Sequence, residues 1–215
     1  RREFKKQLSR FYPVVSEGTE KVPLKKLLSD KYFYLIAVIM ICAGASEQAV
    51  SQWASAFAES ALGVSKLLGD LAGPCAFAFF MGLSRFIYGK YGTRLPLEKT
   101  MLLCSVMCIV CYLVIALSAV PAAALVACAL TGFSVGIFWP GTFSIAAKRI
   151  PGGGTAMYAL LALAGDTGCS SGPTLVGLAA GLMGGKLSFG IGLAILFPFM
   201  ILLGIVIING TKKNG

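Results

Sequence analysis

Two sets of polar residues, each containing one carboxylate, repeat the same spacing within otherwise apolar stretches. They are Glu47, Gln48, Ser51, Gln52 and Ser55, and Asp166, Thr167, Ser170, Ser171 and Thr174. Both sets occupy relative positions i, i+1, i+4, i+5 and i+8, a spacing that puts each set on one face of an α-helix. A carboxylate at the centre of a lipid bilayer costs about 2.5–3.5 kcal/mol. If these stretches cross a membrane, each polar face should therefore border a polar interior or a water-filled cavity.

We predict that both faces line a pathway for a substrate or an ion; the alternative is that they only join helices by hydrogen bonds. Glu47 is the expected coupling residue. A low dielectric favours the protonated form of a carboxyl group, so the charge of Glu47 can depend on which side of the membrane the cavity faces. A protonated carboxyl group can donate to a sugar hydroxyl, whereas a carboxylate only accepts. Gln48 and Gln52 would complete the hydroxyl contacts.

The two tryptophans are further candidates for contact with a solute. Trp139 lies in the middle of an apolar stretch, beside Pro140. It is too deep for the interfacial belt where tryptophan is usual, so we expect its indole to stack on a substrate. For Trp53, both stacking and a place in the belt remain open.

Catalytic and metal chemistry find little support in the residue types. The chain has no histidine, and no serine or cysteine has a plausible partner base, so we do not expect an enzyme. Cys104, Cys108 and Cys111 share a helix face, but three thiols without a histidine or a nearby carboxylate make a poor metal site. We therefore expect neither a metal nor a cofactor.

Six long apolar stretches would position these residues. They cover 32–57, 66–88, 100–119, 122–147, 155–182 and 187–209. Each has about the 20 residues needed to cross about 30 Å of hydrocarbon. With 57% hydrophobic and 13% charged residues, the composition excludes a soluble class of protein. We expect a cytoplasmic linker with an interfacial helix at 1–31, a six-helix transmembrane bundle at 32–209 and a cytoplasmic tail at 210–215.

The basic residues divide unequally between the two ends of these stretches. With alternating crossings, all of the 19 lysines and arginines except Lys66 and Lys186 fall on one side. This is the positive-inside pattern, which predicts that both termini are cytoplasmic. Anionic lipid headgroups would then account for the net charge of +10, so we expect membrane lipid and no nucleic acid as the charged partner.

Short glycine patterns relate the second stretch to the fifth. Gly69-Asp70, Gly73-Pro74 and Gly82-Leu83 in the second are matched by Gly165-Asp166, Gly172-Pro173 and Gly177-Leu178 in the fifth. These two stretches would cross in opposite directions, so the repeat would be inverted, an architecture typical of transporters.

Glycines four residues apart predict closely packed helices, because small side chains let two backbones approach each other. The pairs are Gly69/Gly73, Gly132/Gly136, Gly168/Gly172 and Gly177/Gly181.

Two further motifs resemble those of a known family. The segment Gly82-Leu-Ser-Arg85-Phe-Ile-Tyr-Gly89-Lys90-Tyr-Gly92-Thr-Arg94 spans the end of the second stretch. Gly44-Ala-Ser-Glu47 lies in the first stretch, with Trp53 six residues on. The longer segment resembles the cytoplasmic-loop signature of the major facilitator superfamily of secondary transporters, with Gly89 where an acidic residue is usual. The shorter one is similar to the seventh-helix pattern of fucose-permease-like sugar transporters in that family.

Over residues 21–215 the resemblance is to the C-terminal six-helix half of this family. It implies that the first and fourth stretches line a central cavity, with Glu47 and Trp139 in the cavity and Asp166 reaching it from the fifth. The residues to which it assigns loop gating are Gly82, Arg85, Gly89, Lys90 and Arg94. The implied partner is an N-terminal six-helix half, and the implied location is a bacterial inner (plasma) membrane. Because the chain starts at Arg1 without a methionine, we expect it to be a piece of a longer polypeptide.

The sequence therefore predicts an all-α membrane protein whose six transmembrane helices form two inverted three-helix repeats, half of a twelve-helix major facilitator fold. The expected function is secondary active transport of a small solute, with a sugar as the class that the resemblance favours. Transport would proceed by alternating access and be coupled to protons or another ion. Two alternatives remain open: a cation or multidrug antiporter of the same fold, and a six-helix binding or receptor subunit without transport.

Overall fold

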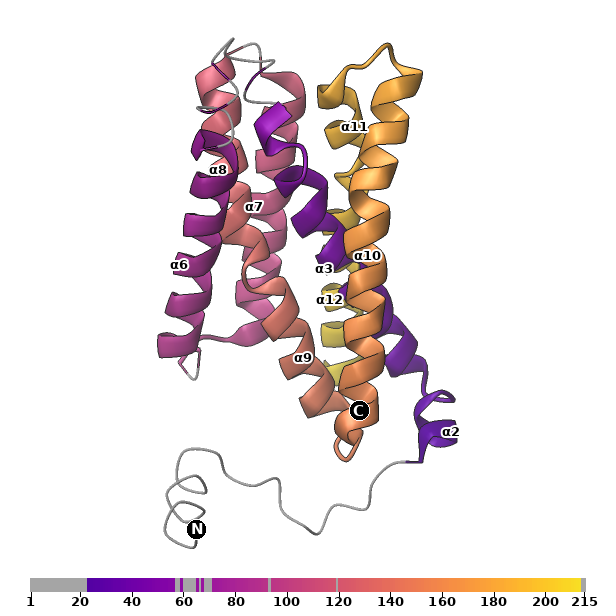
Figure 1. Ribbon diagram of the computed structural model, residues 1–215. Helices are drawn as coiled ribbons and strands as arrows, with labels where there is room; N and C mark the ends of the chain where they lie inside the picture. Colours follow the sequence, from indigo (N-terminus) through magenta and orange to yellow (C-terminus); the bar gives the residue numbers. More distant parts are fainter. Residues whose placement is uncertain are drawn as a thin grey trace, which may run out of the picture.

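The computed structural model of the chain describes residues 23–56, 59, 65, 67, 71–92, 94–118 and 120–213. Within these ranges all regular structure is helical, which confirms the all-α prediction for this part of the chain. The helices are α2 (Leu24–Leu27), α3 (Lys31–Ser51), the π-helical segment η1 (Leu71–Cys75), α6 (Ala76–Tyr91), α7 (Leu97–Leu117), α8 (Pro121–Val135), α9 (Phe138–Arg149), α10 (Gly154–Leu182), α11 (Leu187–Leu193) and α12 (Leu196–Lys213). Figure 1 shows the longer helices side by side as a bundle.

Within the described residues, four helical stretches are long and apolar enough to cross a membrane. They are Lys31–Ala56, Leu97–Leu117, Ala122–Arg149 and Leu187–Gly210. They coincide with the first, third, fourth and sixth stretches expected from the sequence. α6 and the 29-residue α10 run alongside them (Figure 1). The prediction of six crossings, and the limits assigned to linker, bundle and tail, remain predictions. Residues 1–22 of the expected linker lie outside the described residues, and α2 falls where the interfacial helix is expected.

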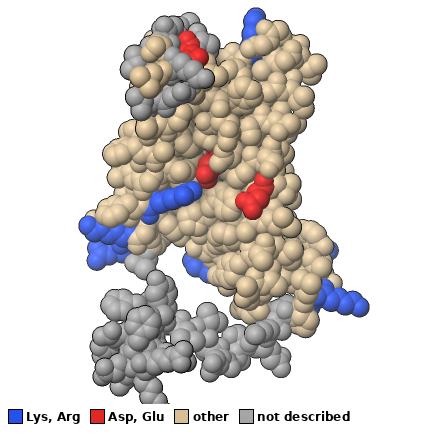
Figure 2. All heavy atoms as spheres, in the orientation of Figure 1, with Lys and Arg blue, Asp and Glu red and all other residues tan. Residues whose placement is uncertain are grey.

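The connections between helices fall at alternate ends of the bundle (Figure 1). The α6–α7 and α9–α10 connections lie at the lower end, near α2, whereas α7–α8 and α10–α11 lie at the upper end. On the face drawn in Figure 2, basic side chains are more frequent toward the lower end. This arrangement agrees with a chain that crosses back and forth between the two ends.

Two of the spans are interrupted where their sequence weakens the helix. α8 starts with Pro121, whose fixed φ suits the first helical turn, and ends at the cap residue Gly136. α9 then begins at Phe138 and carries Pro140 in its first turn, where the missing N–H removes no helical hydrogen bond. A second break separates α11 from α12 at Ala194 and Ile195.

Glycines bring two pairs of helices into close contact. On α10, a methyl group at Gly168 would overlap the carbonyl of Ile41 on α3, and one at Gly172 would lie 2.7 Å from the carbonyl oxygen of Ala45. On α8, a methyl group at Gly132 would overlap the carbonyl of Phe77, and one at Gly136 would lie 2.9 Å from that of Met81 on α6. The close packing predicted from these two glycine pairs is confirmed.

The other glycine pairs behave differently. Gly177 lies against the indole of Trp53, and a methyl group at Gly181 would have no neighbour within 4 Å. Gly73 approaches the carbonyl of Ala54. Gly69, like the Asp70 that begins the expected repeat, lies outside the described residues.

Polar side chains connect helices that are distant in sequence. The hydroxyl of the fully buried Tyr112 on α7 donates to the carbonyl of Ser46 on α3 at 2.7 Å. Arg149, the last residue of α9, donates from Nη2 to the carbonyl of Ile208 on α12 at 2.6 Å. This contact ties the end of α9 to the last turns of α12.

Candidate solute pathway

An ion pair joins α3 to α6. The Nη2 atom of Arg85 donates to Oε2 of Glu47 at 3.4 Å, and it is the one ion pair recorded within the described part of the chain. The Glu47 side chain is 14% exposed and the Arg85 side chain 45% exposed. Figure 2 shows an acidic and a basic side chain touching about halfway along the bundle. Because arginine stays protonated in proteins, a positive charge always faces Glu47 in this conformation.

The position of Arg85 corrects the expectation of a cytoplasmic loop. Gly82, Arg85, Gly89 and Lys90 all lie within α6, which continues to Tyr91. Of the five residues assigned to loop gating, only Arg94 follows the helix. The helix continues because the segment contains no proline and its glycines are spaced among good helix formers and aromatic residues, so two glycines do not stop it. A role of these residues in gating remains a prediction.

The polar residues of α3 bond to one another. Oε1 of Gln48 accepts from the hydroxyl of Ser51 at 3.1 Å and from the amide of Gln52 at 3.2 Å. Gln48 and Ser51 are half-buried and Gln52 is exposed. The face predicted from their spacing therefore forms a connected polar surface that begins at Glu47.

The matching residues of α10 form an exposed polar face. Asp166, Thr167, Ser170 and Thr174 are exposed, and Ser171 is half-buried. The hydroxyls of Thr167, Ser170 and Thr174 donate to the carbonyls four residues back, at 2.8, 3.1 and 2.7 Å. Each hydroxyl oxygen can still accept a hydrogen bond from a solute or water. This polar face lies uncovered on an otherwise apolar helix.

Cys169 lies at the contact between α3 and α10, a place that the sequence did not predict. Its sulfur would be 3.0 Å from a methyl group at Gly44 on α3, so it fills the α3–α10 contact. The sequence did contain a signal, because Cys169 is three residues from Asp166 and hence on the same side of α10.

Trp139 is half-buried, and its ring packs against α10. Its ring lies against Gly165, where a methyl group would be 2.5 Å from Cη2. It also contacts the ring of Phe143 edge-on at 6.3 Å between centroids, and Phe143 contacts Tyr158 at 5.7 Å. The Nε1 atom of Trp139 is buried and has no hydrogen-bond partner among the described residues. Stacking on a solute remains a prediction.

Trp53 connects the end of the first span to α10. Its Nε1 atom donates to the carbonyl of Pro173 at 3.1 Å, and its ring covers Gly177. An open hollow of about 320 Å³ beside it is lined by Gln52, Trp53, Pro173 and Thr174. The indole thus has a structural partner inside the bundle, and neither of its two expected roles is tested.

A comparison with protein families decides the class of protein. The family model described as Major Facilitator Superfamily matches residues 2–173, which include most of α10 and all helices before it. The chain belongs to the major facilitator superfamily. No curated protein and no solved structure matched the chain.

Major facilitator proteins are membrane transporters of small solutes, not enzymes, and this fits the four candidate spans. The family identifies the chain as an integral membrane protein of transporter type. In a major facilitator protein, the polar faces of α3 and α10 and the Glu47–Arg85 pair are the natural candidates for contact with the solute.

Proposed function

We propose that this chain is the C-terminal six-helix half of a secondary active transporter that moves a small polar solute by alternating access, with Glu47 as the proton-coupling residue. The observation that carries the proposal is the Glu47–Arg85 ion pair. Glu47 begins the polar face of α3, and α3 packs beside α10, which has a polar face of its own. Ionisable residues inside membrane spans are costly, and they usually mark substrate or ion pathways.

The ion pair offers a simple coupling device. In the observed arrangement the two charges compensate each other across the α3–α6 contact. When a proton reaches the carboxyl group of Glu47, the attraction between the two opposite charges is lost, whereas Arg85 keeps its charge. α3 and α6 can then shift relative to each other. Proton binding is in this way tied to the change of access that carries the solute.

The same pair argues against a cation as the solute. In the cation or multidrug antiporter alternative, Glu47 and Asp166 would attract positive charge. Glu47 already faces the guanidinium of Arg85 at 3.4 Å, and its protonation would leave a net positive charge at the site. A like charge in a low dielectric is strongly disfavoured. A neutral polyhydroxyl solute such as a sugar, or a sugar acid, fits this charge balance better.

Helix packing supports the half-transporter arrangement. If α3, α6 and α7 form one repeat and α8–α9, α10 and α11–α12 the other, exchanging the repeats maps two pairs of major helix contacts onto each other. α10 packs on α3 as α6 packs on α8, and α12 packs on α3 as α7 packs on α8. A pattern of this kind is expected of inverted repeats related by a pseudo-two-fold axis.

The exposed polar face supports an N-terminal partner bundle. Asp166, Ser170 and Thr174 have no covering helix within the described part of the chain, and such groups are disfavoured against lipid. A second six-helix bundle would cover this face and enclose the pathway. The positive-inside pattern supports cytoplasmic termini, and the resemblance to fucose-permease-like transporters supports a bacterial inner membrane.

Transport in proteoliposomes tests the proposal. The full-length protein is assayed with a labelled hexose, a sugar acid and a quaternary organic cation, under an imposed proton gradient and in solute counterflow. We expect uphill accumulation of the hexose or the sugar acid and none of the organic cation. Glu47→Gln keeps the shape and hydrogen-bonding capacity of the side chain but cannot titrate. It should retain counterflow and lose uphill accumulation.

Two further variants make the assay specific. Glu98→Gln removes a carboxylate in the first turn of α7 and should leave both modes of transport intact. Asp166→Asn should be milder than Glu47→Gln if Asp166 only orders the cavity, and equally severe if it is the coupling site. Normal uphill uptake by Glu47→Gln would remove Glu47 from the mechanism. Solute binding without any transport would favour the receptor-subunit alternative.

A further inference from the structure

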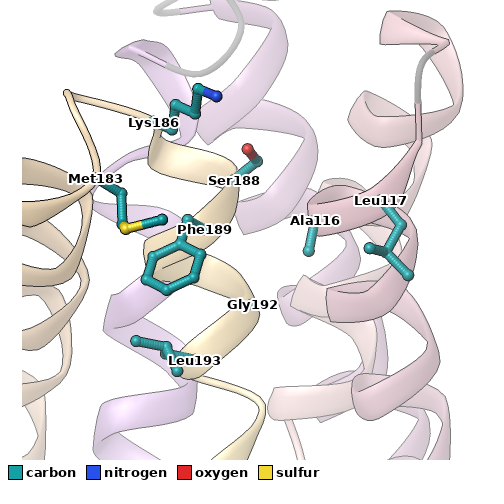
Figure 3. A pocket seen from close by; sticks show the side chains of 8 residues that line it. All are labelled: Ala116, Leu117, Met183, Lys186, Ser188, Phe189, Gly192 and Leu193. Carbon is teal, nitrogen blue, oxygen red and sulfur yellow. The ribbon is translucent and has the colours of Figure 1, made fainter.

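A groove of about 410 Å³ opens between the end of α7 and the short helix α11, away from the polar face (Figure 3). Its lining consists of Ala116, Leu117, Met183, Lys186, Ser188, Phe189, Gly192 and Leu193. Lys186 and Ser188 lie together toward one end in Figure 3, and the remaining lining residues are apolar or lack a side chain.

The local sequence creates this groove. Gly184 and Gly185 have φ angles of 68° and 84°, in the left-handed region that favours glycine, and they turn the chain from α10 into α11. The N–H of Gly185 donates to the carbonyl of Ala180 at 2.8 Å, which closes the end of α10. This turn sets Lys186 at the start of α11. Further along α11, Gly192 has no side chain and leaves space toward Ala116 on α7.

The groove lies where membrane spans end. α7 stops at Leu117, and the span that includes α11 starts at Leu187. The apolar walls therefore extend into the hydrocarbon region from the boundary at which lipid headgroups lie, and Lys186 stands at that boundary. Lys186 is exposed, and no ion pair is recorded for it within the described part of the chain.

The distribution of polar groups excludes a sugar-like occupant and favours a lipid. A polyhydroxyl solute needs several hydrogen-bonding partners around it, and here only the ammonium group of Lys186 and the hydroxyl of Ser188 are available, both toward one end. A molecule with an anionic head and an apolar tail matches this pattern. An ammonium group and a hydroxyl at a helix end can both donate hydrogen bonds to a headgroup phosphate.

We propose that this groove is a binding site for an anionic phospholipid. The phosphate lies against Lys186 and Ser188, and one acyl chain runs along Phe189 and Leu193 toward α7. A second apolar hollow, of about 380 Å³, lies on the other side of α11 and shares Leu193 with the groove. It is lined only by apolar residues and glycine from α10, α11 and α12 and is suited to the second acyl chain. The site is separate from the solute pathway and does not depend on the proposed transport mechanism.

Native mass spectrometry of the purified full-length protein tests this site. The protein is equilibrated in detergent with dioleoylphosphatidylglycerol or with dioleoylphosphatidylcholine, which share their acyl chains and differ in headgroup charge. We expect the wild type to retain the anionic lipid preferentially. Lys186→Gln should weaken binding of the anionic lipid about fivefold, as expected for one lysine near a charged headgroup. Lys186→Arg, which keeps a positive charge at this position, is the matched control and should leave the preference unchanged.

Gly192 variants test the apolar part of the groove. A methyl group there would lie 3.4 Å from Cβ of Ala116, an ordinary contact, so Gly192→Ala should fold and bind lipid. Gly192→Leu should fill the groove and lower retention of both lipids. If Gly192→Leu does not fold, Lys186→Gln still decides the proposal. An unchanged preference in Lys186→Gln, an equal loss in Lys186→Arg, or displacement of the lipid by free glycerol phosphate would each overturn it.

Discussion

The Glu47–Arg85 pair predicts an unequal response to removal of its two partners. We consider Glu47→Gln, Arg85→Gln and the double variant. Arg85→Gln leaves a carboxyl group that is 14% exposed without its partner, whereas Glu47→Gln leaves a guanidinium that is 45% exposed and can turn to water. Because breaking a buried pair costs most when the remaining group is buried, Arg85→Gln should be the more destabilising single change.

The geometry of the pair sets the expected size of the effect. At 3.4 Å, Coulomb attraction with an effective dielectric constant of about 20 amounts to about 5 kcal/mol, which is an upper bound. The exposure of Arg85 and the cost of desolvating Glu47 reduce this value toward that of exposed pairs, which are worth about 0.2–1 kcal/mol. We expect a coupling energy of about 1–2 kcal/mol, between exposed and fully buried pairs. For a chain of this size it corresponds to a shift of about 2–8 °C in the apparent Tm.

Thermal unfolding of the four proteins in one detergent measures the cycle. Arg85→Gln should lower the apparent Tm by several degrees and Glu47→Gln by less, and the double variant should be no worse than Arg85→Gln alone. Lys99→Gln, which removes a charge from an exposed position on α7, is the control for loss of positive charge. Additive losses in the double variant, or a larger loss in Glu47→Gln than in Arg85→Gln, would refute the energetic coupling of the two residues.

Two further predictions concern helix packing and topology. Gly168→Ala should lower the apparent Tm by several degrees, since overpacking costs about 1–3 kcal/mol. A methyl group at Gly181 on the same helix has no neighbour within 4 Å, so Gly181→Ala should be neutral or stabilising. Equal effects in the two variants would contradict the α3–α10 packing. Single cysteines at Gly153 and Lys212 should react with a membrane-impermeant maleimide only from the cytoplasm, and one at Lys186 only from outside. Labelling of Gly153 and Lys186 from the same side would contradict the six-crossing topology.

The spans and their closest contacts could be predicted because they depend on local properties of the sequence. Hydrocarbon requires long apolar runs, so four of the six expected stretches coincide with helices of sufficient length and hydropathy. Gly168 and Gly172 predicted close packing because only a missing side chain lets two helix backbones approach this far. Their partner helix, α3, could not be read from the same pattern, since a glycine pair does not specify what packs against it.

The site was only partly predictable for the same reason. Periodicity put Glu47 and Gln48 on one face of a helix, but the partner of Glu47 lies 38 residues away on α6. The resemblance to a loop signature assigned Arg85 to a loop, whereas the continuation of α6 brings its guanidinium to Glu47. The contact of Trp139 with Gly165 could not be predicted, because it depends on how α9 meets α10.

Solvent access to α10 tests most directly whether the polar face lines an alternating-access pathway. Ser170→Cys is made in a variant whose two accessible cysteines, Cys75 and Cys169, are replaced by serine, since the remaining cysteines are buried. Leu175→Cys, on another face of the same helix and 51% exposed, is the lipid-facing control. In vesicles of the full-length protein, we predict that an impermeant maleimide labels Ser170→Cys from both sides, that a transported solute slows this reaction, and that Leu175→Cys stays unlabelled. Absence of labelling of Ser170→Cys from either side, with normal transport by the same variant, would contradict the account.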